Sequence, residues 1–169
     1  MATDHPACRE ALESTRRRIS HLLNSKGNTP VDSFHRELGS VMIDRCGISR
    51  NADGLRQGLE QVKALEQRFE AEVRVPGETS GPNAELEKAL RVKDFIGLAQ
   101  LMLRDALARE ESCGAHFREE HQSEEGEAQR DDVNFAHIAA WEHKADGEPI
   151  RHSDCLLYTS DAADDLGRV

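Results

Sequence analysis

The sequence predicts a mainly α-helical fold, an antiparallel bundle of three to four helices followed by a polar loop and a short β-hairpin. Apolar residues recur at helical spacing in four segments before residue 112. Helix start signals and glycine stop signals separate these segments. Aromatic residues make up only 4% of the chain and charged residues 32%, which is typical of helices with narrow apolar stripes. The 169 residues suit one domain of ordinary size.

The first helix is expected over residues 6–25, as the leading element of a segment 1–28. Asp4 or His5 can cap it, and Pro6 fits the first turn, where its missing N–H costs nothing. The three arginines at 16–18 are expected to be solvated. The expected apolar stripe consists of Leu12, Ile19, Leu22 and Leu23.

The next two helices follow in the predicted bundle, residues 29–112. Thr29 is expected to cap the second helix with Pro30 as its first residue, and Gly47 to end it. Asn51 is expected to cap the third helix, which runs to about residue 73. The buried side chains expected on these helices are Phe34, Leu38, Val41, Met42, Leu55, Leu59, Val62, Phe69 and Val73.

The longest helix is expected from Ala84, capped by Asn83, to about Glu111. The short loop before it should make the third and fourth helices antiparallel. Its expected apolar residues are Leu86, Leu90, Ile96, Leu101, Leu103 and Leu107.

A polar, charge-rich stretch occupies residues 112–132, and on composition alone it is a solvated loop. A strand is expected over residues 134–143 and a return strand over 150–153. Asp146 and Gly147 form a strong hairpin-turn signal between them. Loop and hairpin together make an expected region 113–154.

Composition and motifs exclude several function classes. The net charge of −10 argues against nucleic-acid binding, and no apolar run approaches the roughly 20 residues that span a membrane. Residues 1–6 do not resemble a secretory signal.

The first three of the four cysteines, Cys8, Cys46 and Cys113, are expected to be free thiols in a reducing compartment. No glycine-rich nucleotide motif is present.

No catalytic, cofactor-binding or metal-binding residue is predicted from spacing. Cys113 and His116 offer two ligands where a structural zinc site takes four, and they lie too close in sequence for a typical cysteine–histidine catalytic pair. Adjacent carboxylates such as Glu119 and Glu120 do not converge on one helix face. A metal-dependent hydrolase is therefore a weak alternative.

Two segments nevertheless carry a family resemblance. Residues 109–120, REESCGAHFREE, resemble the R-x-E-S-R-G-A-H-x-R-x-D signature of succinate dehydrogenase and fumarate reductase flavoprotein subunits. Residues 130–135, RDDVNF, match the R-D-D-x-N-F/W element that follows it. Residues 34–38 and 47–50 resemble two upstream landmarks, so the resemblance covers about residues 3–153. Cys113 stands where the family signature has an arginine, and the insert at residues 122–129 is longer than in many members. Together these two features resemble the branch of the family that works with diheme cytochrome b partners.

The resemblance implies that the chain is the C-terminal helical domain of a subunit that interconverts succinate and fumarate. In this family FAD accepts the hydride and electrons pass to an iron–sulfur subunit and then to quinone. The FAD-binding and catalytic residues lie upstream, so this chain alone is expected to be inactive. Implied partners are the subunit's own flavin-binding and capping domains, the iron–sulfur subunit and a cytochrome b membrane anchor. The implied location is peripheral, on the cytoplasmic side of the bacterial inner membrane.

A docking surface for the missing flavin domain is predicted within the two signature segments, because small residues permit close backbone approach and arginine binds carboxylates bidentately. The candidate residues are Ser112, Gly114, His116, Arg118, Arg130, Asp131 and Asp132.

The end of the chain is expected not to be native sequence. Residues 155–165, CLLYTSDAADD, match one reading frame of a transposase end followed by a sequencing-library adapter. Residues 155–169 are therefore expected to have no stable place in the fold. Two further alternatives stay open: the C-terminal domain of L-aspartate oxidase, and a free-standing helical interaction module.

Overall fold

The computed structural model describes residues 5–77, 81–144 and 148–155. Its contacts divide the chain into two compact units. The first unit contains residues 1–44 and 57–100, and the second contains residues 45–56 and 101–169. Each unit is described by itself below.

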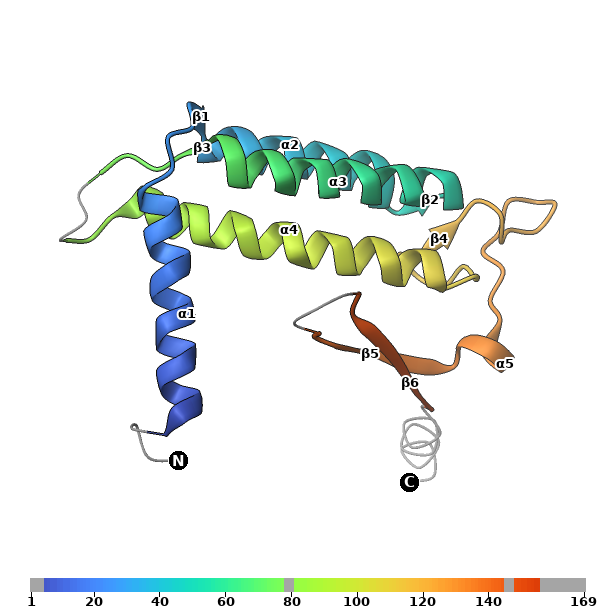
Figure 1. Cartoon of the computed structure of the whole chain (residues 1–169). Helices are drawn as coiled ribbons and strands as arrows, with labels where there is room; N and C mark the ends of the chain where they lie inside the picture. Colours follow the sequence, from blue (N-terminus) through green and yellow to red (C-terminus); the bar gives the residue numbers. More distant parts are fainter. Residues whose placement is uncertain (1–4, 78–80, 145–147, 156–169) are drawn as a thin grey trace, which may run out of the picture. The chain divides into compact units, whose positions relative to one another are not determined.

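The first unit is a bundle built from consecutive antiparallel helices (Figure 1). Its elements are α1 (Pro6–Leu23), β1 (Thr29–Pro30), most of α2 (Val31–Cys46), most of α3 (Ala52–Glu72), β3 (Val73–Arg74) and the first part of α4 (Ala84–Ala108). Helices α2, α3 and α4 run alongside one another in alternating directions, and α1 lies across them at one end (Figure 1). The predicted mainly helical, antiparallel bundle is confirmed.

The core of the first unit combines large side chains from α2 and α3 with small ones from α4. Phe34 and Phe69 are fully buried, and their rings meet edge to face at a centroid distance of 5.3 Å. The α4 side contributes Ala89, Val92, Ile96 and Ala99. The expected leucines at 86 and 90 are only half-buried, because they flank this alanine-rich seam instead of forming it.

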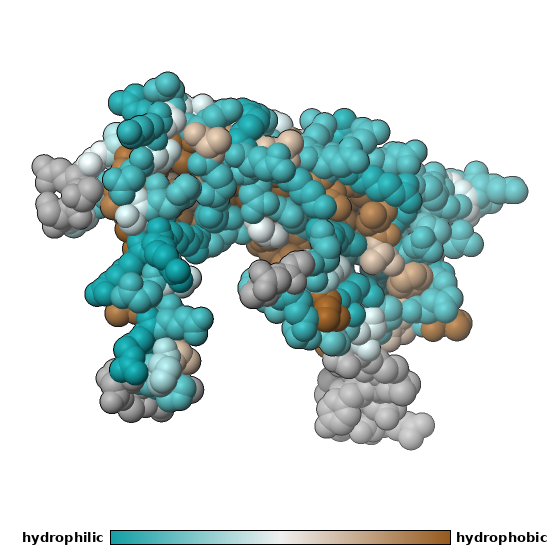
Figure 2. Space-filling view, in the orientation of Figure 1, coloured by the Kyte–Doolittle hydropathy of each residue, from teal (hydrophilic) through white to brown (hydrophobic). Residues whose placement is uncertain are grey.

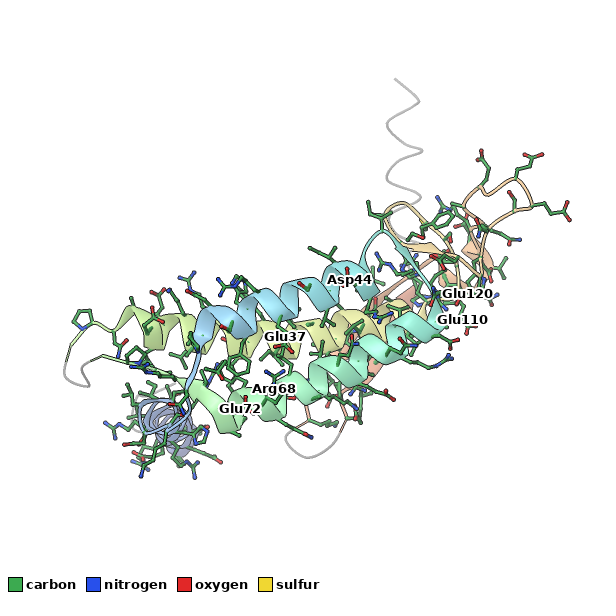
Figure 3. The ribbon with its side chains drawn as sticks, turned by 90° about the horizontal axis from the view of Figure 1, so that it is seen from above. Glu37, Asp44, Arg68, Glu72, Glu110 and Glu120 are labelled. Atoms are coloured by element: carbon green, nitrogen blue, oxygen red, sulfur yellow. The ribbon has the colours of Figure 1, made fainter. Side chains whose placement is uncertain are left out.

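Ion pairs join α2 and α3 on the outside of this core. Arg68 of α3 lies between Glu37 of α2 and Glu72 of its own helix (Figure 3), with nitrogen–oxygen distances of 2.7 Å and 3.7 Å. All three side chains are largely exposed, so these pairs add little stability.

Three helix starts agree with the sequence prediction. The Nδ1 atom of His5 accepts a hydrogen bond from the backbone N–H of Ala7. The side-chain oxygens of Asn51 and Asn83 likewise accept from backbone N–H groups in the first turns of α3 and α4. These are the polar caps that helix starts require.

The start of the second helix was predicted incorrectly. Thr29 and Pro30 form the short strand β1, paired in parallel with Val73 and Arg74 of β3, and α2 begins at Val31. This pairing joins residues more than forty positions apart, so it leaves no local signal. Helix α4 also ends at Ala108, three residues before the expected end.

Two expectations for α1 also need correction. Arg18 is only partly solvated: its Nη2 atom donates to the carbonyl of Leu90 at 3.1 Å and to Asp94 at 2.5 Å, both on α4. Leu12, expected in the buried stripe, is 49% exposed, and Leu22 is the buried residue of this helix.

The second unit contains a loop region and the predicted β-hairpin. Its elements are β2 (Ser49–Arg50), β4 (Phe117–Arg118), α5 (Asp132–Phe135), β5 (His137–Glu142) and β6 (Ile150–Cys155). Strands β5 and β6 are antiparallel, with Trp141 opposite Arg151. Residues 134 and 135, expected at the start of the strand, belong instead to the short helix α5, residues 132–135. The turn signal at residues 146–147 lies outside the described residues.

Strand β6 includes Cys155, the first residue of the expected non-native tail, paired with His137. Residues 156–169 lie outside the described part of the chain, so the non-native tail stays a prediction.

Among the helices that the structure describes, none combines the length and apolar character needed to cross a bilayer. The face shown in Figure 2 is largely hydrophilic, with small apolar areas.

Candidate functional site

Arg118 is the central side chain of the first signature segment. It lies in β4 and is only 2% exposed. Its Nη1 atom donates to the carbonyl oxygens of Ala106 at 3.0 Å, Leu107 at 3.2 Å and Arg109 at 3.2 Å. The last carbonyls of a helix have no partner within the helix and carry partial negative charge. The guanidinium therefore caps the C-terminus of α4.

Ser112 closes the first segment on itself. Its hydroxyl accepts from the Arg118 N–H at 2.8 Å and donates to the Arg118 carbonyl at 3.1 Å. Its own N–H donates to the carbonyl of Gln129 at 2.8 Å. Because Ser112 is fully buried, these bonds fix the loop that carries Arg118.

Glu111 joins the two signature segments. Its side chain is 1% exposed and accepts from Arg109 Nε at 2.7 Å and from the backbone N–H of Asp131 at 2.9 Å. A buried carboxylate is costly unless it is paired and hydrogen-bonded, and both conditions are met here. The pair ties the end of α4 to the start of the second segment.

The upstream landmark at residues 47–50 lies beside the first signature segment. Strand β2 pairs in parallel with β4, so Phe117 N–H donates to the Ile48 carbonyl and Glu119 N–H to the Arg50 carbonyl. The Arg50 side chain donates to the Ala115 carbonyl at 3.0 Å. Two family landmarks that are far apart in sequence are thus adjacent in the fold.

Glu120 caps the start of α3, as its position in Figure 3 shows. It accepts from the backbone N–H of Ala52 and pairs with Arg118 Nε at 3.2 Å. Burial raises the pKa of Glu120, but the hydrogen bond from Ala52 and the charge of Arg118 outweigh it, so the pKa lies below its usual range.

His116 is half-buried beside the same helix end. Its Nε2–H donates to the carbonyl of Arg109 at 2.9 Å. Burial lowers the pKa of His116, and this outweighs the opposing effect of that hydrogen bond, so the ring favours the neutral form. Gly114 allows the tight turn between Cys113 and His116 because its φ is +57°.

The second segment is held by Asp131. Its carboxylate accepts from the backbone N–H of Asn134 at 3.1 Å and from the Asn134 side chain at 2.7 Å, which caps α5. These bonds hold the pKa of Asp131 below its usual range. Arg130 and Asp132 pair with each other at 2.6 Å and remain more than 60% exposed.

Asp105 on α4 holds the hairpin in the second unit. Its Oδ1 atom accepts from Trp141 Nε1 at 3.2 Å and from Arg151 Nε at 3.1 Å, one residue from each strand. Arg151 also lies 3.3 Å from the His137 ring nitrogen. A two-stranded hairpin alone is marginally stable, so this clamp is an important part of its attachment.

The seven predicted docking residues therefore lie in one connected region, but they differ in exposure. Ser112 and Arg118 are buried, His116 and Asp131 are half-buried, and Gly114, Arg130 and Asp132 are exposed. An open hollow of about 470 Å³ lies in the same region. It is lined by Glu110, His121, Gln129, Arg130, Asp131, Asn134 and Phe135.

Sequence reasoning missed Glu111, Glu120 and Asp105. Spacing treats Glu120 only as one of two adjacent carboxylates and Glu111 only as one of another such pair at the end of the long helix. Their positions inside the signature, beside Ser112 and Arg118, were the available signal. Nothing in the local sequence marks Asp105, because its partners lie more than thirty residues away.

The hydrogen bonds described at this site are structural. Its buried polar side chains Glu111, Ser112 and Arg118 are bonded to other groups of this chain. Burial raises the pKa of the Cys46 thiol, which Arg50 only partly offsets, so this thiol is poorly reactive. Within the described ranges no cluster of three or more metal-ligating side chains occurs.

Comparison with known proteins decides the family. The family model described as "Fumarate reductase flavoprotein C-term" matches residues 35–159, well over half of the chain. The chain belongs to this family. The fumarate reductase flavoprotein subunit of Escherichia coli K12 is 31% identical over 143 residues, 84% of this chain and 23% of that protein. The corresponding Serratia subunit is 30% identical over 157 residues, 90% of this chain and 25% of that protein.

Solved structures agree with this assignment. A quinol-fumarate reductase with menaquinol molecules matches 92% of this chain and 26% of its own, with a TM-score of 0.75 and 28% identity. The Mycobacterium smegmatis Sdh1 complex in the apo form matches with a TM-score of 0.72 at 19% identity, and supports the fold alone. The chain thus spans about a quarter of the length of these relatives.

Proposed function

We propose that the chain is the C-terminal domain of a flavoprotein subunit that interconverts succinate and fumarate. The family assignment and the fumarate reductase relatives support this proposal. The observation that carries it is that both signature segments fold together, around the buried Arg118 and the buried Glu111. Signature segments used in this way would build a scaffold and leave the chemistry to other parts of the subunit.

FAD and the substrate would be held by domains of the parent subunit outside this chain. Electrons would leave through an iron–sulfur subunit and pass to quinone by way of a cytochrome b membrane anchor, for which the diheme type is our preferred candidate. The relatives include a quinol-fumarate reductase, which supports such an assembly. The parent subunit would then be peripheral to the membrane, on its cytoplasmic side.

The first test uses the isolated chain. Purified chain should be colourless, should retain no flavin after incubation with FAD, and should oxidise no succinate. The buried side chains of Glu111, Ser112 and Arg118 are already hydrogen-bonded within the chain, so they would not be available to a flavin. Stoichiometric flavin absorbance in the purified chain would contradict the proposal.

The chain's own role would be to dock against the flavin-binding domain. The exposed members of the predicted set, Gly114, Arg130 and Asp132, would form the contact. The less exposed members, Ser112, His116, Arg118 and Asp131, would hold the contact surface in shape. Arg130 is suited to this role because it is 61% exposed and pairs with the similarly exposed Asp132.

Charge reversal tests this docking role. Arg130→Glu in the parent subunit should lower the content of bound flavin and the melting temperature, but should change the isolated chain little. Arg56→Glu is a matched control, because Arg56 is also 61% exposed and pairs with a neighbouring aspartate. Equal effects of Arg130→Glu in the parent subunit and in the isolated chain would rule out docking through Arg130.

A further inference from the structure

The described contacts of helix α1 with the bundle of the first unit lie in its C-terminal part. Leu22 is 1% exposed, and Arg18 binds Asp94 and the Leu90 carbonyl on α4. His21 pairs with Glu70 of α3 at 2.9 Å. These contacts lie within the last six residues of a helix that is 18 residues long.

The earlier part of α1 extends away from the bundle (Figure 1). Every residue from 5 to 17 is exposed except Cys8, which is half-buried. A helical segment of about this length is marginal in water without tertiary packing. The exposed part of α1 is therefore expected to be stable as a helix only when another segment packs against it.

The exposed surface of α1 has two faces. Cys8, Leu12 and Ile19 share one face with the buried Leu22, because these positions recur at helical spacing. Glu10, Glu13 and Arg17 lie on the opposite face. Leu12 is 49% exposed, so the apolar stripe that is buried at Leu22 continues uncovered toward the start of the helix.

The length of the relatives indicates what covers this stripe. The chain spans only 23–26% of them and matches a C-terminal family model, so about three quarters of such a subunit would precede α1. That part would be attached directly at the bare end of the helix. A segment tethered so closely has a high effective concentration at the stripe.

We propose that the segment preceding α1 in the parent subunit packs on the exposed part of this apolar stripe, at Leu12 and Ile19. This inference rests on the proposed function, because it requires a parent flavoprotein subunit. Helix α1 is then the joint between the flavin-binding part and the bundle. It is a second contact, separate in sequence from the docking surface around Arg130.

Hydrogen exchange of the backbone amides in residues 6–17 tests this joint. In the isolated chain these amides should exchange rapidly at every protein concentration. In the parent subunit they should be strongly protected. Leu12→Gln in the parent should reduce that protection about tenfold or more, because a packed leucine side chain is lost. Glu10→Gln is the matched control on the charged face and should change protection less than about twofold.

Three results would overturn the inference. The first is equally rapid exchange in the parent subunit and in the isolated chain. The second is equal loss of protection in Leu12→Gln and Glu10→Gln. The third is protection in the isolated chain that rises with concentration, which would identify a second copy as the occupant. The flavin content of the same parent sample distinguishes failure of this inference from failure of the proposed function. A parent subunit that contains flavin but leaves the α1 amides unprotected would contradict the role of α1 as a joint and would not affect the proposed function.

Discussion

At the residue scale, Arg118 shows how one buried cation organises a helix end. Its Nη1 atom donates to two carbonyl oxygens in the last turn of α4 and to the Arg109 carbonyl just after the helix. Arg118→Met should lower the free energy of unfolding of the isolated chain by about 2–4 kcal/mol, because these buried acceptors and Glu120 lose their donor. Urea denaturation measures this. Arg130→Met, at an exposed arginine twelve positions away, should cost less than about 0.5 kcal/mol; equal costs would contradict the capping role.

His116 should make stability depend on pH. Folding lowers the pKa of this histidine, so the neutral ring favours the folded state. The stabilisation is fully present above the ordinary pKa of 6.5 and is lost as the pH falls through the lower folded pKa. Wild type should therefore lose melting temperature between about pH 7.5 and pH 5.

His116→Gln keeps a donor for the Arg109 carbonyl without a titrating ring, so its melting temperature should vary less over that pH range. An unchanged pH dependence in His116→Gln would show that other groups are responsible.

The residue scale also shows what the sequence could predict of the site. The motif identified Ser112, Arg118, Arg130 and Asp131 as a group, and the structure places them in one region. Spacing could not tell that Arg118 points inward. That depends on the pairing of β4 with β2, whose residues lie nearly seventy positions earlier. The docking role of the group stays a prediction.

At the element scale, α4 packs through small side chains. Ala99 is 3% exposed and lies in a seam with Val92 and Ile96, facing a core in which Phe34 and Phe69 are already closely packed. Ala99→Leu should destabilise the chain by about 1–3 kcal/mol, because a well-packed core cannot take the added volume. Thermal denaturation should show this, whereas Ala108→Leu at the exposed end of α4 should be nearly neutral.

The β-hairpin should depend on Asp105. Asp105→Ala removes the shared acceptor of Trp141 and Arg151, so the hairpin should loosen. Trp141 is the only tryptophan in the chain, and its fluorescence should therefore shift toward that of a solvated indole. Asp94→Ala on the same helix contacts Arg18 instead and should leave the emission unchanged. Unshifted emission in Asp105→Ala would mean that the clamp is dispensable.

Helices were predicted well because their signals are local. The caps Asn51 and Asn83 lie next to the apolar periods that they start. The short parallel strands were missed because each joins distant residues, as Thr29 joins Val73. Local spacing also favoured large leucines on α4, while close helix packing selected the alanines.

At the scale of the whole molecule, the family could be recognised from the sequence because its landmarks keep their order. The family model and the relatives confirm that recognition. The expected division into residues 1–28, 29–112, 113–154 and 155–169 stays a proposal. Composition and spacing alone predict only a helical domain, whereas the two signature segments indicate the family.

The most direct measurement of the central claim uses the parent subunit produced together with its iron–sulfur partner. Flavin absorbance and succinate–fumarate turnover should both be present in the complete subunit. Both should be lost when the residues corresponding to this chain are deleted, because the flavin-binding part then loses its docking partner. A complete subunit without flavin, or a deleted subunit that keeps full flavin content and turnover, would contradict the account.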